Sequence, residues 1–162
     1  MDFPEHRTVF YKGVKFDLAT MFDADYNDGY TLTDDPMARI IYEMNINFSV
    51  ELFDENWIEE IQYSFDEEID PLDAVHDYYI TERMNSLQDP IPSAKKELPK
   101  DIKLDGYIQT IHGADYSYED ESSYFTATVL FDEQIFVFQM IGKKENMGYL
   151  YDDFEELLRS IH

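Results

Sequence analysis

Residues 124–141, YFTATVLFDEQIFVFQMI, are the stretch that decides the fold of this chain. The runs 124–131 and 134–141 are rich in aromatic and β-branched side chains, and only Asp132 and Glu133 separate them. Two such runs joined by two turn residues predict a β-hairpin. The chain is therefore expected to build an antiparallel sheet.

Several other stretches predict further strands of this sheet. Residues 8–18 are two short β-rich runs around a Lys-Gly turn, and residues 30–33 and 107–112 are short strand candidates. Within residues 40–52, apolar and polar side chains alternate, which is typical of a strand with one solvated face. The apolar positions of that strand are Ile46, Phe48, Val50 and Leu52, and the polar ones are Asn45, Asn47, Ser49 and Glu51.

Three stretches predict helices. Residues 70–87 form the best candidate, because Asp70 suits the N-cap and Pro71 the first helical position. The stripe expected along that helix is Leu72, Val75, Tyr79, Arg83 and Leu87. Residues 56–65 suggest a short helix or turn that leads into a strand, and residues 151–161 suggest an amphipathic helix that closes the chain. The core stripe of this last helix would be Phe154, Leu157, Leu158 and Ile161.

The order of these elements predicts the fold class. Strands, a helix, a strand, a long loop at residues 113–123, a hairpin and a helix suggest an α+β fold with an antiparallel sheet flanked by helices. An α/β/α sandwich is the expected arrangement. The chain has 162 residues, no internal repeat and no low-complexity linker, so residues 1–162 are expected to be one domain.

The acid content restricts the classes of partner. Residues 40–82 hold thirteen Asp and Glu and neither Lys nor Arg, and the whole chain has a formal net charge of -24. Such a field repels nucleic acid and anionic membranes and attracts basic proteins or cations. The chain is therefore expected to bind a basic protein and not nucleic acid. Its sequence does not indicate an oligomeric state.

The N-terminal sequence and the apolar runs bear on location. MDFPEHRTVF has no basic region followed by an apolar one, and no apolar run approaches the ~20 residues that span a bilayer. We therefore expect no membrane insertion and a cytoplasmic location, with a trimmed secretory or lipoprotein signal left open. With no Cys, the chain has neither disulfides nor thiolate metal sites.

The last third of the chain carries a distinctive order of motifs. An Asp-Gly strand is followed by the hairpin, a Gly after its second strand, and a helix ending in a Leu-x-Ser-Ile phrase. The residues that carry this order are Leu104, Asp105, Gly106, Gly142, Leu158, Ser160 and Ile161. Over residues 102–161 the pattern resembles the closing portion of the PsbP/Mog1-like superfamily.

The resemblance implies a fold and a broad kind of activity. Members of this superfamily include a photosystem II extrinsic protein, a regulator of the small GTPase Ran, bacterial lipoproteins and chaperones for secretion effectors. Most of them act by binding, without catalysis. The resemblance therefore implies a non-enzymatic adaptor or chaperone-like protein that needs no cofactor.

An acidic turn near the N-terminus is a candidate calcium site. The segment DADYNDGYTLTD resembles an EF-hand loop, with Asp23, Asp25, Asn27 and Asp34 at ligand positions. Gly29 lies one position later than that loop requires, and no flanking helices are evident. The alternative is a solvated acidic turn.

A tyrosine-bracketed segment is the candidate partner surface. Within residues 113–124, the candidate contacts are Tyr116, Tyr118, Glu119, Asp120, Glu121 and Tyr124. Tyrosine interleaved with acid suits Lys or Arg, through charge and cation–π contact. The alternative is that several of these rings fill the core.

The sequence contains no catalytic motif. No nucleophile elbow, phosphate-binding glycine cluster or closely spaced His pair is present. His76 lies beside Asp73 and Asp77 on the predicted helix, a pairing that is usually a surface contact. The chain is therefore expected to be a protein-binding domain rather than an enzyme. Two alternatives remain: an immunity protein or inhibitor of a basic toxin or nuclease, and a calcium-binding or DNA-mimicking module.

Overall fold

A computed structural model describes residues 6–19, 23–26, 30–33, 47–65, 68–115, 121–143 and 147–162. Its main element is an eight-stranded sheet in the order β3-β4-β5-β10-β9-β8-β6, with β7 also paired to β8. These strands are β3 Asp23–Tyr26, β4 Tyr30–Thr33, β5 Asn47–Phe53, β6 Leu87–Pro92, β7 Lys96–Glu97, β8 Asp105–Asp115, β9 Glu121–Phe131 and β10 Gln134–Lys143. A separate hairpin and three helices complete the described residues: β1 His6–Tyr11, β2 Val14–Ala19, α2 Glu55–Tyr63, α3 Pro71–Asn85 and α4 Met147–Arg159.

The hairpin predicted from residues 124–141 lies in the middle of this sheet. β9 and β10 pair antiparallel with Gln134 opposite Phe131, and each strand has another neighbour on its far side. Asp132 and Glu133 form the turn with φ of 49° and 63°. A two-residue turn whose twist matches that of the two strands it joins requires positive φ at both positions. The expected hairpin is confirmed.

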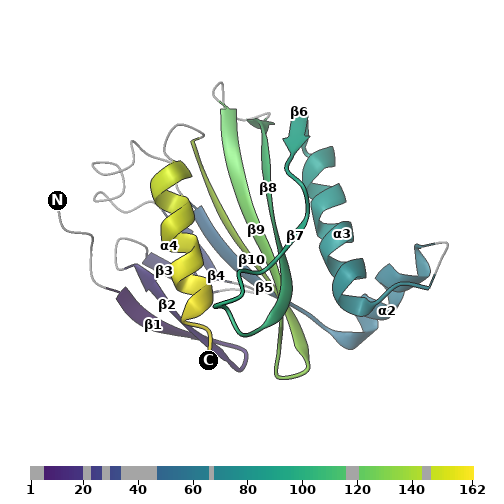
Figure 1. Ribbon diagram of the computed structural model, residues 1–162, viewed down its shortest axis with the longest axis horizontal. Coiled ribbons are helices and arrows are strands. Elements are labelled where there is room, and N and C mark those ends of the chain that lie inside the picture. The colour runs from purple at the N-terminus through teal and green to yellow at the C-terminus, as the bar shows by residue number, and fades with distance from the viewer. Residues whose placement is uncertain are drawn as a thin grey trace.

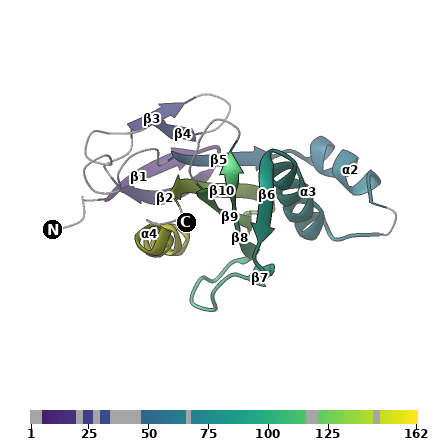
Figure 2. The same ribbon diagram turned by 90° about the horizontal axis from the view of Figure 1, so that it is seen from above.

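Both faces of the central strands are covered (Figure 1). α4 and the β1–β2 hairpin lie on one side, and α2 and α3 on the other, so the expected helix–sheet–helix layering is confirmed. Seen from above, the segment around β7 projects from the sheet beside β8 (Figure 2). Burial on both faces explains why residues 122–129 are all buried.

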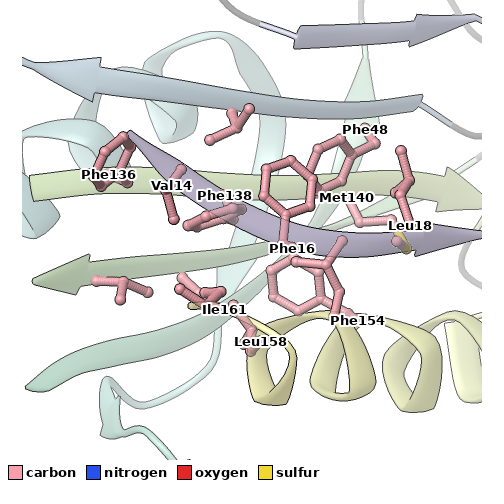
Figure 3. Close-up of a cluster of buried hydrophobic side chains, with 14 of the residues drawn as sticks. Val14, Phe16, Leu18, Phe48, Phe136, Phe138, Met140, Phe154, Leu158 and Ile161 are labelled. Atoms are coloured by element: carbon pink, nitrogen blue, oxygen red, sulfur yellow. The ribbon is translucent and has the colours of Figure 1, made fainter. Parts of the chain in front are cut away.

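The larger core lies between the sheet, the β1–β2 hairpin and α4 (Figure 3). Phe138 on β10 and Phe16 on β2 meet edge to face, with ring centroids 5.3 Å apart. Burying each such ring contributes about 1.5–3 kcal/mol. All four residues of the stripe predicted for the last helix are buried: Phe154, Leu157, Leu158 and Ile161. The C-terminal residue also ties this layer together, because His162 exchanges two backbone hydrogen bonds with Lys15 of β2.

The helices of the opposite layer begin where sequence signals place them. The Asp70 carboxylate accepts a hydrogen bond from the Leu72 amide at 2.9 Å, and Pro71 is the first residue of α3. Asp54 caps α2 in the same way through the Trp57 amide. Capping of this kind satisfies amides that the helix leaves unpaired. The predicted helices at 56–65 and 70–87 are confirmed, although α3 ends at Asn85. The strand expected after the first of them was wrong, because the next element among the described residues is α3.

Three local expectations were wrong. Leu87 belongs to β6, whose φ of 47° at Asp89 and shifted register interrupt the pairing with β8. The loop expected at 113–123 is shorter, since β8 runs to Asp115 and β9 begins at Glu121. The polar face of β5 is not fully solvated: Glu51 is half-buried and faces the α3 layer.

Candidate functional site

A polar layer lies between α3 and the sheet, and His76 is at its centre. The ring is fully buried, with Nδ1 2.8 Å from the Thr128 hydroxyl and Nε2 3.0 Å from Gln109 Oε1. Burial lowers the pKa of His76, because the charged ring would lose its hydration. The expected surface contact with the neighbouring aspartates is therefore wrong: the ring turns toward the sheet.

The hydrogen bonds of Gln109 determine the tautomer of this histidine. Gln109 Nε2 donates to the Ser93 carbonyl at 2.8 Å, which leaves its Oε1 toward His76 as an acceptor. His76 Nε2–H must then donate to Gln109, and Nδ1 accepts from the Thr128 hydroxyl. Both ring nitrogens are used, so His76 has the character of a structural residue.

A second part of the layer surrounds Gln139 of β10. The Tyr79 hydroxyl and Arg83 Nη2 both donate to Gln139 Oε1, the latter at 3.2 Å. The Arg83 guanidinium also lies over the Tyr124 ring, 4.9 Å from its centroid. Burial raises the pKa of Tyr79. Three buried polar atoms lack a hydrogen-bond partner within the described residues: Arg83 Nε, Thr126 Oγ1 and Gln139 Nε2.

At the outer edge of this layer, Lys95 joins α3 to the sheet. Its ammonium is 3.1 Å from both Asp73 and Asp77, and it lies 4.7 Å from the centroid of the Tyr107 ring. Partial burial works against the charge on Asp73, but hydrogen bonds from Tyr107 and Lys95 outweigh it and lower the pKa of Asp73. The cluster shows how this surface holds a cation, between carboxylates and an aromatic face.

A hollow of about 590 Å³ opens beside this cluster. It lies at the N-terminal end of α3, between that helix, the β7 segment and the start of β8. Its lining residues are Asp70, Leu72, Asp73, Glu97, Leu98, Pro99, Lys100, Ile102, Leu104, Asp105, Gly106, Tyr107 and Leu130. Four of these carry a carboxylate and one carries an ammonium, so the hollow has an acidic rim and an apolar floor.

The candidate partner segment is only partly described. Tyr124 is 1% exposed inside β9, so its proposed role as a surface contact is wrong. The cause is that β9 is covered on both faces, and the Tyr124 side chain points to the α3 layer with Ile80 and Ile111. Glu121 begins β9. The other four residues of the prediction lie outside the described residues: Tyr116, Tyr118, Glu119 and Asp120.

The candidate calcium loop is built on a β-hairpin. Asp23 and Asp25 belong to β3, opposite Thr33 and Thr31 of β4. An EF-hand loop instead joins two helices, so the resemblance to that loop does not extend to the backbone. Asn27 and Asp34 lie outside the described residues. Within the part of the chain that is described, no three His, Asp or Glu side chains are grouped to hold a metal ion.

The sequence contained no sign that residues from separate segments gather around one hollow, although Asp70 was expected as an N-cap and Asp105 in the Asp-Gly motif. Glu97, Asp105 and Tyr107 are separated along the chain from Asp70, and only the fold brings them together. Gly106 was the available signal, because it belonged to the Asp-Gly motif. A Cβ at that position would lie 2.2 Å from the Thr128 carbonyl oxygen, so β8 approaches β9 in a way that only glycine permits.

Solved structures with the same fold cover nearly the whole chain. Mog1p, a Ran-binding protein of Saccharomyces cerevisiae, matches 98% of this chain and 95% of its own, with a TM-score of 0.63 and 12% identity. A point mutant of Mog1 gives the same values. A Pseudomonas aeruginosa protein of unknown function matches 96% of this chain and 94% of its own, with a TM-score of 0.50 and 6% identity.

These matches show that the chain has the Mog1-like α+β fold, as the resemblance in its last third implied. No protein-family model matches the sequence. No curated protein matches it either. Among the described residues, the helices are too short or too polar to cross a bilayer.

Proposed function

We propose that this chain is a non-enzymatic protein-binding module that recognises a basic partner. The observation that carries the proposal is the net charge of -24, which makes electrostatic attraction to a basic surface strong at long range. An acidic partner would be repelled by this charge. The same fold in a Ran-binding protein supports a binding role for the scaffold.

The distribution of acids on the described surface supports the same partner chemistry. α2 exposes Glu55, Glu59 and Glu60, and its last turn contains no basic residue to balance them. The hollow at the start of α3 adds a second acidic area. The segment with Tyr116, Tyr118, Glu119, Asp120 and Glu121 remains a proposed contact. A cytoplasmic location remains part of this proposal.

The character of His76 supports a role without catalysis. It is the one histidine among the described residues that is completely buried, and both of its nitrogens are engaged by uncharged side chains. A general base must reach a substrate proton, which this ring does not. The polar layer therefore acts to orient α3 on the sheet.

Affinity capture followed by binding of the purified partner tests the proposal. The tagged chain is used to isolate partners from cells of its source, and each is purified and titrated by calorimetry at about 50 mM and about 500 mM NaCl. We expect a partner with a basic surface and a dissociation constant that rises with salt. Partners that are all neutral or acidic, with salt-independent affinity, would contradict the proposal.

A further inference from the structure

The rim of the hollow contains two carboxylates that have no partner among the described residues. Asp70 caps α3, and Asp73 is engaged by Lys95. The side chains of Glu97 and Asp105 are exposed and form no hydrogen bond or ion pair with other described residues. Lys100 is the one cation among the lining residues. The formal charge of the lining is therefore -3, from four carboxylates and one ammonium.

The floor of the hollow is apolar. Among its lining residues, Leu72, Leu98 and Ile102 are buried, and Leu104 and Leu130 are half-buried. An occupant should therefore combine an aliphatic stem with a cationic end. Long basic side chains have this build, because their methylene groups cover apolar surface while the charge stays at the rim.

The two available carboxylates come from different segments, which favours arginine over lysine. Glu97 lies in β7 and Asp105 at the start of β8. A guanidinium presents five donors in a planar fork and can reach more than one carboxylate, whereas an ammonium is a compact point charge. The ammonium of the nearby Lys95 does contact two carboxylates, but those of Asp73 and Asp77 lie one turn apart on the same helix, whereas Glu97 and Asp105 come from two strands.

The hollow is held open by the backbone around it. Leu98 N–H donates to the Gly106 carbonyl at 3.1 Å, and Ile102 N–H donates to the Pro99 carbonyl at 2.9 Å. Asp101, next to this turn, pairs with Arg159 of α4. A preformed site loses less conformational entropy when a ligand binds.

We propose that this hollow receives an arginine side chain of the basic partner. The inference rests on the proposed function, since it names the residue type by which the partner is recognised. Glu97 and Asp105 bind the guanidinium, the leucine and isoleucine floor takes its stem, and Lys100 limits the affinity through like-charge repulsion.

Chemical-shift mapping with a small probe tests the site without the partner. ¹⁵N-labelled protein is titrated with N-acetyl-arginine methylamide and, separately, with its uncharged citrulline counterpart. We expect the arginine probe to shift the amides of Leu98, Gly106 and Tyr107, with a dissociation constant on the order of 1–10 mM for a ligand of this size. Equal shifts from both probes, or no shifts at these amides, would overturn the proposal.

Three variants separate the site from general electrostatics. The double variant Glu97→Gln, Asp105→Asn should weaken binding of the arginine probe by at least about fivefold. Lys100→Gln should strengthen its binding by about twofold to fivefold. Asp152→Asn with Glu156→Gln removes the same charge from exposed positions on α4, and should leave binding within about twofold. Equal losses in the two double variants would mean that only net charge matters, which would overturn the site.

Binding of the captured partner distinguishes failure of this inference from failure of the proposed function. If the Glu97→Gln, Asp105→Asn variant binds the partner about tenfold more weakly than the α4 control, the site is supported. If both variants bind a basic partner equally, the hollow is not the contact although the function stands. If no basic partner exists, the function fails, and the arginine probe alone decides whether the hollow binds a guanidinium.

Discussion

Replacing His76 with glutamine should flatten the dependence of stability on pH between about 7.5 and 5.5. In the folded protein the ring is fully buried against Thr128 and Gln109, which carry no charge. Burial lowers the pKa of His76, with a further lowering by Lys95 and opposing effects from the Gln109 hydrogen bond and the two aspartates. The unfolded chain takes up a proton near the ordinary histidine pKa of 6.5.

The sign and size of the effect follow from this difference. As the pH falls below about 6.5, His76 binds a proton in the unfolded state but stays neutral in the folded state. The free energy of unfolding therefore decreases until the pH reaches the lower pKa that His76 has in the folded protein. One proton changes the free energy of unfolding by at most about 1.4 kcal/mol per pH unit. When the pH falls from 7.5 to 5.5, protonation of His76 in the unfolded state therefore lowers the free energy of unfolding by up to about 1.4 kcal/mol.

Urea unfolding followed by fluorescence measures this loss. Trp57 is the single tryptophan and stacks on the buried Phe53 with centroids 4.1 Å apart, so its emission should report the loss of this core. Burial raises the pKa of Glu51, so protonation of this residue stabilises the folded state as the pH falls, opposite to the effect of His76. The wild type and the His76→Gln variant share this contribution, so it cancels in their comparison. His162→Gln, at an exposed histidine, is the control. Identical pH slopes for the His76→Gln variant and the wild type would refute the assignment of His76 as a buried neutral residue.

Two further predictions concern the backbone. Gly106→Ala places a Cβ 2.2 Å from the Thr128 carbonyl oxygen and should lower the free energy of unfolding by about 2 kcal/mol or more. In Gly113→Ala the nearest atom to the added Cβ is 3.3 Å away in a leucine side chain, so the loss of stability should be smaller. Equal melting temperatures of the two variants would contradict this explanation. Glu133→Gly relieves a φ of 63° in the β9–β10 turn and should stabilise the protein by about 1 kcal/mol, measured by thermal unfolding. A lower melting temperature for that variant would show that the turn is not strained.

Elements with a local signal were predictable. The Asp-Pro start of α3 and the two-residue turn of the β9–β10 hairpin are specified by neighbouring residues, and both are where the sequence places them. β6 was missed because Pro90 and Pro92 indicate a break, whereas an edge strand tolerates proline. Tyr124 was misplaced because a strand covered on both faces leaves no polar alternation to show which side chains are exposed.

The polar layer and the hollow depend on tertiary contacts that sequence patterns do not contain. His76 meets Thr128 across a separation of 52 residues and Gln109 across 33. The hollow combines the start of α3 with β7 and β8. Only the acid excess and the Asp-Gly motif suggested an acidic site, and neither indicated which carboxylates would have no partner among the residues that the structure describes. Composition alone leads to the proposal of a basic partner, whereas the place where exposed carboxylates gather is known only from the fold.

The association rate of the purified partner tests the central claim most directly. If the charge of -24 steers a basic protein onto this chain, the rate constant measured by stopped flow should fall at least about tenfold between about 20 mM and about 500 mM NaCl. The dissociation rate should change much less, because short-range contacts determine it. An association rate that does not change with salt would contradict recognition of a basic partner.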